Sequence, residues 1–266
     1  MAVFGFIGIG NMGGALACAA AKAIDPKNIL VAAKHPERAA AFAEKYRMLP
    51  ADNARIAREA DYIVLGVKPQ FMAQVLGELQ AVLTERTNAV LVTMAAGLTM
   101  EMIQKMAGTP LPVIRIMPNT PCQVGTGLIL YDAQPEVTQW QLEGFLQAMA
   151  PAGKAERLPE RLIDAGSAIA GSGPAFACMF IEALADGGVA CGLPRQQAMT
   201  FAAQMLLGSA QLVLESGQHP GQLKDAVCSP GGSTIQGVRA LEGSRMRSAV
   251  TEAVIATYEK NREFAK

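Results

Sequence analysis

The sequence predicts an α/β fold, with an N-terminal Rossmann-type doubly wound sheet followed by an all-α C-terminal domain. Up to about residue 155, short apolar runs alternate with helical patterns, as in a parallel sheet that helices cover on both faces. A glycine-rich turn follows the first run, and after Pro159 the strand signal disappears. We therefore expect a dinucleotide-binding domain at 1–158 and a helical domain at 159–266.

The first part contains nearly continuous apolar runs, and we expect strands at Val3–Ile7, Ile29–Ala32, Tyr62–Val67, Ala89–Thr93 and Val113–Met117. A last pair is expected near Gly127–Tyr131 and Lys154–Arg157. Helical patterns cover Ala15–Ala23 and Pro36–Tyr46, the second with proline near its first turn.

The second part is rich in Ala, Gly and Ser. It predicts a long helix over Leu162–Ala190, with a break near Gly171–Pro174, a helix from Pro194 to about Ser216, and shorter helices after it. Small residues let helix backbones approach closely. This favours an interface between two copies of the chain, with tight packing inside one chain as the alternative.

Composition excludes several classes. Lys+Arg and Asp+Glu each number 23, which disfavours nucleic acid and anionic membranes as partners. The five cysteines form no Cys-x-x-Cys pair, so neither disulfides nor a metal site are expected. The start lacks a signal-peptide pattern, and Glu182 and Asp186 interrupt the apolar stretch Ala165–Leu193, which indicates a buried helix and not a membrane span. We expect a cytoplasmic protein.

The glycine turn Gly8-Ile9-Gly10-Asn11-Met12-Gly13 lies between a predicted strand and a predicted helix, the setting that a dinucleotide requires. Gly8 would permit the tight turn, Gly10 would let a diphosphate approach the backbone, and Gly13 would let the helix sit on the sheet. The alternative is an unrelated turn that happens to contain three glycines.

The residues after the second strand indicate which dinucleotide binds. Sites that prefer NAD usually place an acid there, but this chain has Lys34 and no acid before Glu37. Lys34 and Arg38 could instead bind a 2′-phosphate, which favours NADPH, with NADH as the alternative cofactor. Both could also be ordinary surface charges.

Three further loops follow predicted strands, at Val67–Pro69, Met94–Gly97 and Met117–Pro121. The small residues of the second would let a flat nicotinamide ring lie against backbone. Turn-forming residues would account for all three loops without a ligand. Whether Lys68 orients substrate or only caps its turn stays open.

A second candidate site lies far along the chain at Ser229-Pro230-Gly231-Gly232-Ser233-Thr234, before a helical pattern. Free backbone N–H groups beside hydroxyl oxygens form an anion cradle that suits a carboxylate or a phosphate. The alternative is a plain N-capped helix after a Pro-Gly turn.

With this loop the whole chain resembles the pyrroline-5-carboxylate reductase family. The resemblance lies in six ordered motifs, at 5–10, 67–69, 95–97, 117–121, 171–175 with 183–189, and 223–242. It implies reduction of 1-pyrroline-5-carboxylate to L-proline with NAD(P)H, the last step of proline synthesis. It also implies a homodimer through the C-terminal helices, often assembled into decamers, with the substrate at the dimer interface.

The resemblance also assigns residues by position. The carboxylate role falls on Ser229, Gly231, Gly232 and Ser233, and Thr234 matches a threonine near the ring nitrogen, with helix capping as its alternative role. Cofactor contacts fall on Ile7, Gly8, Gly10, Asn11, Met12, Lys34, His35, Asn53, Val67, Lys68, Pro69, Met94, Ala95, Ala96 and Gly97. One departure is Ala226, where some relatives carry Asn.

The residue inventory agrees with imine chemistry. Neither His35 nor His219 has the setting of a catalytic base, which a carbonyl reductase would need. A protonated cyclic imine accepts hydride directly, so positioning can supply most of the acceleration. A β-hydroxyacid dehydrogenase is disfavoured because no lysine closely follows Gly171–Pro174. A dinucleotide-sensing regulator would not need the second loop.

Overall fold

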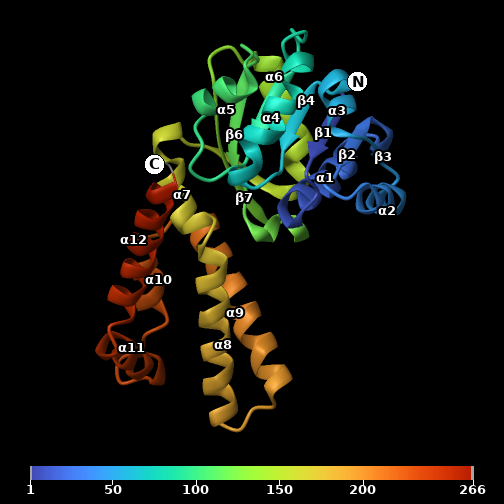
Figure 1. Cartoon of the computed structure of the whole chain (residues 1–266). Helices are drawn as coiled ribbons and strands as arrows, with labels where there is room; N and C mark the ends of the chain where they lie inside the picture. The colour runs from blue at the N-terminus through green and yellow to red at the C-terminus, as the bar shows by residue number, and fades with distance from the viewer. Residues whose placement is uncertain (1, 265–266) are drawn as a thin grey trace. The chain divides into compact units, whose positions relative to one another are not determined.

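The computed structural model describes residues 2–264, the last of them by its backbone alone. Contacts divide the chain into two compact units, Met1–Ser172 with Thr257–Lys266, and Gly173–Ala256 (Figure 1). A boundary after residue 158 would place the helix at Glu160–Ala170 with the C-terminal part, whereas by its contacts this helix groups with the sheet.

The first unit is built on an eight-stranded sheet in the order β3-β2-β1-β4-β5-β6-β7-β8. The strands are β1 Phe4–Ile7, β2 Ile29–Ala32, β3 Leu49–Pro50, β4 Tyr62–Leu65, β5 Val90–Thr93, β6 Val113–Met117, β7 Gly127–Ala133 and β8 Gly153–Arg157. The chain order reverses between β1 and β4, which is where doubly wound sheets bind ligands. The first six strands are parallel, whereas β7 pairs antiparallel with β6 and parallel with β8.

Helices cover both faces of this sheet, as the unbroken apolar strands predicted. In β1, Phe4 and Phe6 pack in one core with α1 (Asn11–Ala23), α6 (Gln139–Met149) and part of α2 (Pro36–Tyr46). Ile7 packs in the other with α3 (Asn53–Glu59), α4 (Pro69–Leu83) and α5 (Met100–Ala107). Short 3₁₀ turns lie at Pro26–Asn28, Thr120–Val124 and Ala150–Ala152.

Helix α7 (Glu160–Ala170) packs on the sheet through Ile163, which shares a small core with Met117 of β6 and Leu130 of β7. Its middle turn also accepts a hydrogen bond, because the Asn261 side-chain amide donates to the Asp164 carbonyl at 3.4 Å. This hydrogen bond connects α7 to the last turns of α12, and both of these parts of the chain belong to the first unit.

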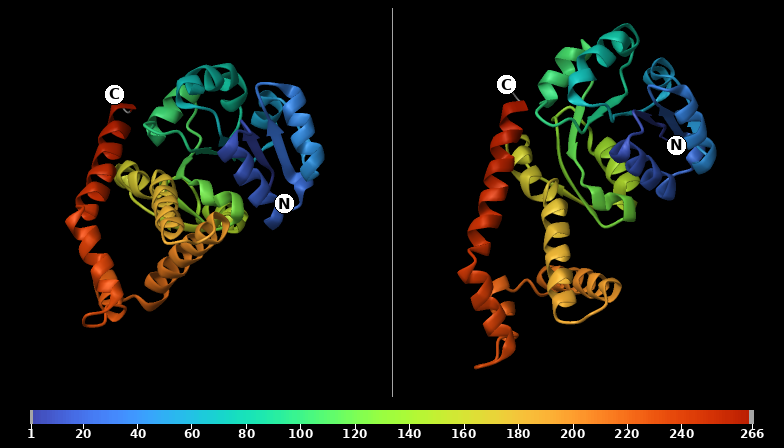
Figure 2. Two further views of the ribbon diagram at one scale, coloured as in Figure 1. Left: turned by 90° about the horizontal axis from the view of Figure 1, so that it is seen from below. Right: turned by 60° about the horizontal axis from the view of Figure 1, so that its bottom comes forward.

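The second unit contains α8 (Gly173–Ala190), α9 (Arg195–Ser216), α10 (Pro220–Ala226), α11 (Ser233–Gly243) and most of α12 (Met246–Phe264). Helices α8 and α9 pack against each other as a hairpin (Figures 1 and 2). The break between α7 and α8 falls where the sequence predicted it. The helices that follow are all shorter than the 22 residues of α9, as the sequence predicted, and α12 with 19 residues is the longest of them.

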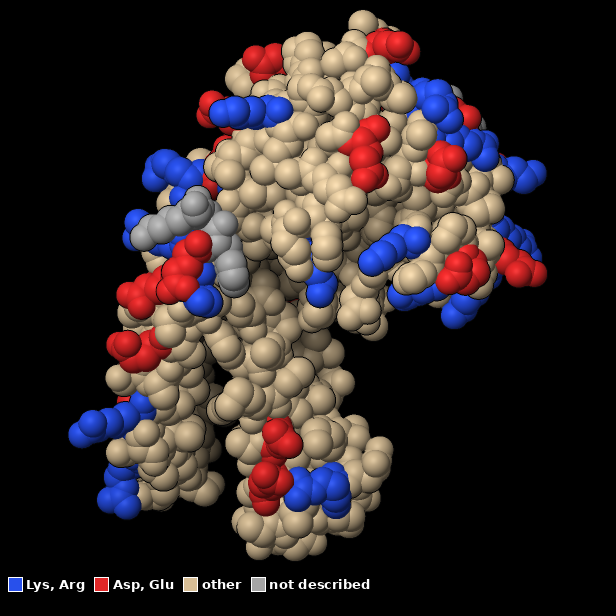
Figure 3. Space-filling model, viewed as in Figure 1, with Lys and Arg blue, Asp and Glu red and all other residues tan. Residues whose placement is uncertain are grey.

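The apolar helices of the second unit are largely uncovered in the single chain. The stretch Glu160–Ala190 is long and apolar enough to cross a membrane, and 11% of its most apolar window is buried. The prediction of a buried helix there is therefore wrong for one chain taken alone, although Ala185 is fully buried. On the face shown in Figure 3 most of the surface of α8 and α9 is uncharged. Exposed apolar side chains include Met179, Phe201, Leu207, Leu212 and Leu214.

Candidate active site

The turn after β1 has the geometry that its three glycines predicted. Gly8 adopts φ +97°, and a Cβ built there would lie 2.8 Å from the Gly66 carbonyl oxygen. A Cβ on Gly13 would lie 2.1 Å from the Gly8 carbonyl oxygen, so only glycine lets α1 start this close to β1. Around Gly10 a Cβ would meet nothing within 4 Å. The turn is therefore closed by Gly8 and Gly13 and open at Gly10.

Gly10 is also the N-cap of α1, with Asn11 and Met12 in the first turn. The first backbone N–H groups of a helix have no acceptor within the helix, and the helix dipole places partial positive charge at this end. No acidic side chain occupies the first turn of α1. This end of the helix can therefore bind a diphosphate beside the open space at Gly10.

A cavity of about 460 Å³ opens beside this turn. It is lined by seven of the predicted cofactor residues, namely Ile7, Gly8, Gly10, Lys34, Asn53, Val67 and Lys68. The structure thus brings together residues from the ends of β1, β2 and β4 and the start of α3. Its volume lies in the range of a small-molecule site.

Sequence reasoning missed one wall of the cavity. Phe71, Gln74, Val75 and Glu78 line it from α4, and their spacing of three and four residues places them on one face of that helix. The spacing was a usable signal, but no helix was predicted there. Gly66, which also lines the cavity, was missed as well. The structure explains this glycine, because a Cβ on it would lie 2.3 Å from the Gly8 carbonyl oxygen.

Three cationic side chains line the cavity, and two of them, Lys34 and Arg38, lie beside the end of β2, whereas Lys68 follows β4. Glu37, the nearest acid in sequence, is 74% exposed and pairs with the His35 imidazole at 3.6 Å. Neither Glu37 nor His35 lines the cavity. The Lys34 ammonium group and the Arg38 guanidinium group can therefore bind an additional phosphate beside β2, because the Glu37 carboxylate does not line the cavity with them.

The remaining predicted cofactor residues lie outside the cavity lining. Pro69 is the first residue of α4, with Lys68 as its N-cap. Met94, Ala95, Ala96 and Gly97 form the loop after β5, in which Ala95 and Gly97 are buried and Gly97 has φ +75°. The carboxyl ends of parallel strands meet at one edge of a sheet, so this loop follows the Gly66–Lys68 loop along that edge.

The loop Met117–Pro121 has a structural role that accounts for its polar side chain. The Asn119 side-chain amide donates to the Ala170 carbonyl at 3.0 Å and accepts from the Leu128 N–H at 2.9 Å. Burial raises the pKa of the neighbouring Cys122 thiol, which keeps it neutral. Asn119 therefore fastens the end of α7 to β7.

In the second unit, the loop 227–232 leads into α11. Gly231 has φ +71°, the Gly232 N–H donates to the Ser229 carbonyl at 3.0 Å, and Gly232 is the N-cap of α11. Ser233 and Thr234 are the first two residues of the helix, so Thr234 is not the cap, and the capping alternative for it is wrong. Ser229 and Thr234 are exposed. Hydroxyls and free N–H groups thus share one helix start.

Two polar neighbours of this loop are engaged locally. The Asp225 carboxylate, 2.6 Å from Lys224 Nζ, raises the pKa of that ammonium group. His219 caps α10, because its Nδ1 accepts the Gly221 N–H at 3.1 Å. The imidazole of His219 therefore has a structural role at the start of α10, which was not predicted from the sequence.

Comparison with known proteins identifies both parts of the chain. A family profile described as "Pyrroline-5-carboxylate reductase dimerisation" matches residues 160–264. One described as "NADP oxidoreductase coenzyme F420-dependent" matches residues 3–97. The chain is 40% identical to the pyrroline-5-carboxylate reductase of Escherichia coli K12 over 265 residues, which are 98% of each chain.

Solved structures give the same result. The Plasmodium falciparum pyrroline carboxylate reductase with NADP bound superposes with a TM-score of 0.89 at 31% identity, covering 100% of this chain and 98% of that one. The pyrroline-5-carboxylate reductase of Coxiella burnetii gives a TM-score of 0.90 at 31% identity, with coverage of 100% and 99%. With the glycine turn, the cavity and the loop before α11 in place, the chain belongs to the pyrroline-5-carboxylate reductase family.

Proposed function

We propose that this protein reduces 1-pyrroline-5-carboxylate to L-proline with NADPH, the last step of proline synthesis. The observation that carries the proposal is the full-length identity of 40% to a named reductase in a chain with an open dinucleotide turn. The second loop supports it, because a dinucleotide-sensing regulator would have no need of a carboxylate cradle.

NADPH supplies a hydride when bound, and the chain supplies binding and orientation. The start of α1 and the space at Gly10 bind the diphosphate. Lys34 and Arg38 bind the 2′-phosphate, which makes NADPH the preferred cofactor and NADH the weaker one. His35, Asn53, Val67–Pro69 and Met94–Gly97 complete the proposed cofactor contacts.

The substrate is bound by the loop before α11. Ser229, Gly231, Gly232 and Ser233 bind its carboxylate through hydroxyl and N–H groups. The Thr234 hydroxyl hydrogen-bonds the ring nitrogen and orients the imine. When hydride reaches the imine carbon, the C=N double bond becomes single and the nitrogen, already protonated, becomes the amine of proline. Positioning of the two reactants supplies most of the acceleration.

We propose a homodimer through the helices of 159–266 as the functional unit, with the substrate at its interface. The exposed apolar side chains of α8 and α9 support it, because many such side chains on two neighbouring helices are typical of a protein interface. The decamer that family members often form is a second assembly, which light scattering distinguishes from the dimer by mass. We place the enzyme in the cytoplasm, and we keep 1–158 and 159–266 as its functional domains.

NADPH oxidation followed at 340 nm tests the function with three mixtures. The first contains pyrroline-5-carboxylate, the second a β-keto or semialdehyde acid, and the third no acceptor. We expect oxidation in the first mixture only. Oxidation in the second alone would replace the proposal by a hydroxyacid dehydrogenase, and binding of NADPH without turnover in any mixture would favour a sensor.

A further inference from the structure

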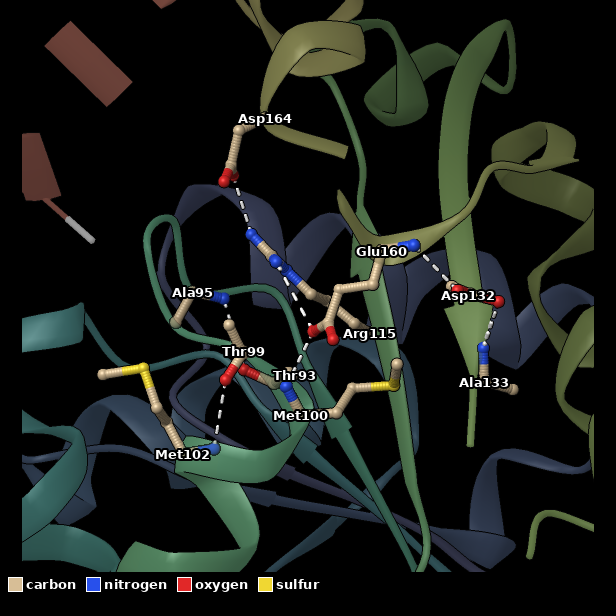
Figure 4. A network of polar contacts seen from close by, with 10 residues as sticks. All are labelled: Thr93, Ala95, Thr99, Met100, Met102, Arg115, Asp132, Ala133, Glu160 and Asp164. Carbon is tan, nitrogen blue, oxygen red and sulfur yellow. Dashed lines mark hydrogen bonds and ion pairs between the residues drawn. The ribbon is translucent and has the colours of Figure 1, made fainter. Parts of the chain in front are cut away.

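A buried arginine links the sheet to α7 (Figure 4). Arg115 of β6 is 2% exposed, its Nη1 lies 3.4 Å from Glu160 Oε1, and its Nη2 lies 2.7 Å from Asp164 Oδ1. Glu160 and Asp164 are four residues apart in α7, so they lie on the same face of that helix. The Arg115 Nε has no partner among the described residues. The two carboxylates therefore provide the compensation that the buried charge needs.

The two carboxylates differ in what else they bind. The same Glu160 Oε1 accepts the backbone N–H of Met100 at 2.7 Å. Met100 is the first residue of α5, and its N–H has no acceptor within the helix. Asp164 Oδ1 makes no hydrogen bond to α5 among the described residues. Glu160 alone therefore connects the buried arginine to the start of α5.

Helix α5 begins directly after the loop Met94–Leu98. At the other end of this loop, the Thr93 hydroxyl accepts the Ala95 N–H at 3.3 Å, and Thr93 is the residue of β5 that pairs with Arg115 in the sheet. Thr99, the N-cap, accepts the Met102 N–H at 3.2 Å. The loop is thus held at one end by a buried threonine and at the other by the Glu160 carboxylate, 60 residues later in the chain.

The position of the loop indicates what it contacts. Lys34 and Arg38 lie beyond β2, on one side of the β1 turn, and the loop after β5 lies on the other side. In sheets of this order the dinucleotide crosses the point where the strand order reverses. With the 2′-phosphate at Lys34, the nicotinamide half reaches toward the loops after β4 and β5.

We infer that Glu160, oriented by Arg115, is a positioning residue that fixes the Met94–Leu98 loop for the nicotinamide half of the cofactor. The inference rests on the proposed function for the identity of that cofactor. Asp164 orients the same arginine without touching the loop. It therefore offers a matched control, since its removal also leaves the buried guanidinium with one carboxylate.

The experiment compares Glu160→Ala, Glu160→Gln and Asp164→Ala in the full-length protein. Dissociation constants are measured for NADPH and for adenosine 2′,5′-bisphosphate, which lacks the nicotinamide half. Melting temperatures report folding, and kcat and KM are measured where turnover occurs. The ratio of the two dissociation constants isolates the nicotinamide half from general loss of structure.

We expect Glu160→Ala to weaken NADPH about 10-fold or more and to lower kcat/KM by about 10- to 100-fold, because small misplacements of reacting groups have effects of this size. Binding of the bisphosphate should stay at the wild-type value. Glu160→Gln, whose neutral oxygen can still accept from Met100, should fall between wild type and alanine. It also serves if the alanine variant does not fold. Asp164→Ala should lower the melting temperature but keep the wild-type ratio.

An unchanged ratio of the two dissociation constants in the Glu160 variants, including equal weakening of both ligands, would overturn the inference. The same change of that ratio in Asp164→Ala would overturn it as well. If the wild-type protein binds NADPH but does not reduce pyrroline-5-carboxylate, the proposed function fails. The ratio of dissociation constants then still decides whether Glu160 positions the loop.

Discussion

Replacing Gly10 with alanine is expected to weaken NADPH binding strongly while leaving the fold intact. The backbone at Gly10 has φ −67° and ψ −167°, which alanine adopts without strain, and the added Cβ meets no atom within 4 Å. The weaker N-cap and the lower entropy of the unfolded chain partly offset each other, so we expect stability to change by less than about 1 kcal/mol. The new methyl group instead occupies the space through which a diphosphate approaches the N–H groups of α1.

The size of the binding defect follows from the hydrogen bonds that the methyl group would prevent. Each hydrogen bond to a charged group contributes about 1.5–3 kcal/mol, and displacing the diphosphate removes at least two. The dissociation constant of NADPH should therefore rise about 100-fold or more. Titration calorimetry measures it, and urea unfolding measures stability.

Gly13→Ala is the matched control. Its Cβ would lie 2.1 Å from the Gly8 carbonyl oxygen, so α1 must move and the free energy of unfolding should fall. Tight NADPH binding by folded Gly10→Ala protein, or a large loss of stability in that variant, would refute the reasoning about the turn.

Three further predictions concern other parts of the site and fold. In steady-state assays, Thr234→Ala should lower kcat/KM about 100-fold, whereas Thr234→Ser should stay close to wild type. Near-wild-type activity of the alanine variant would contradict the role of the hydroxyl. Changing Lys34 and Arg38 together to alanine should raise KM for NADPH about 10-fold or more and leave KM for NADH unchanged. An equal rise of KM for the two cofactors would show that Lys34 and Arg38 bind no 2′-phosphate. Burial raises the pKa of Tyr62 to about 12, so the stability that its neutral phenol contributes is fully present below about pH 10 and lost as pH rises toward 12. Urea unfolding should therefore show that Tyr62→Phe, which loses the 2.7 Å hydrogen bond to the Gln141 carbonyl, is less stable than wild type by about 1 kcal/mol at pH 8. By pH 11 the wild type should have lost about 1.4 kcal/mol relative to the variant, and a constant difference between them would contradict the raised pKa.

The buried centre of the sheet was the most predictable part of the fold. Strands β2 and β6 match their predicted bounds, because strands covered on both faces form nearly continuous apolar runs, which Arg115 alone interrupts in β6. Strand β3 has two exposed residues, Leu49 and Pro50, and gives no such signal. The antiparallel direction of β7 was not predicted either, since strand pairing depends on contacts far apart in the sequence.

Those parts of the site that consist of a few consecutive residues were also predictable. The glycine turn and the loop before α11 each lie within a few residues, so their chemistry is visible in sequence. The wall that α4 contributes required a helix that was not predicted, and the contact of Arg115 with Glu160 joins residues 45 positions apart. The small residues of α8 favoured an interface between two copies, but its apolar pattern alone does not reveal whether its own chain or a partner covers the helix.

The most direct test of the central claim is the stoichiometry of the reaction. Purified protein is incubated with 1-pyrroline-5-carboxylate and NADPH, and the L-proline formed is quantified by chromatography against the NADPH oxidised. We predict one proline for each NADPH, and no proline when the cofactor is omitted. NADPH oxidation without proline, or no oxidation by folded protein that binds NADPH, would contradict the assignment.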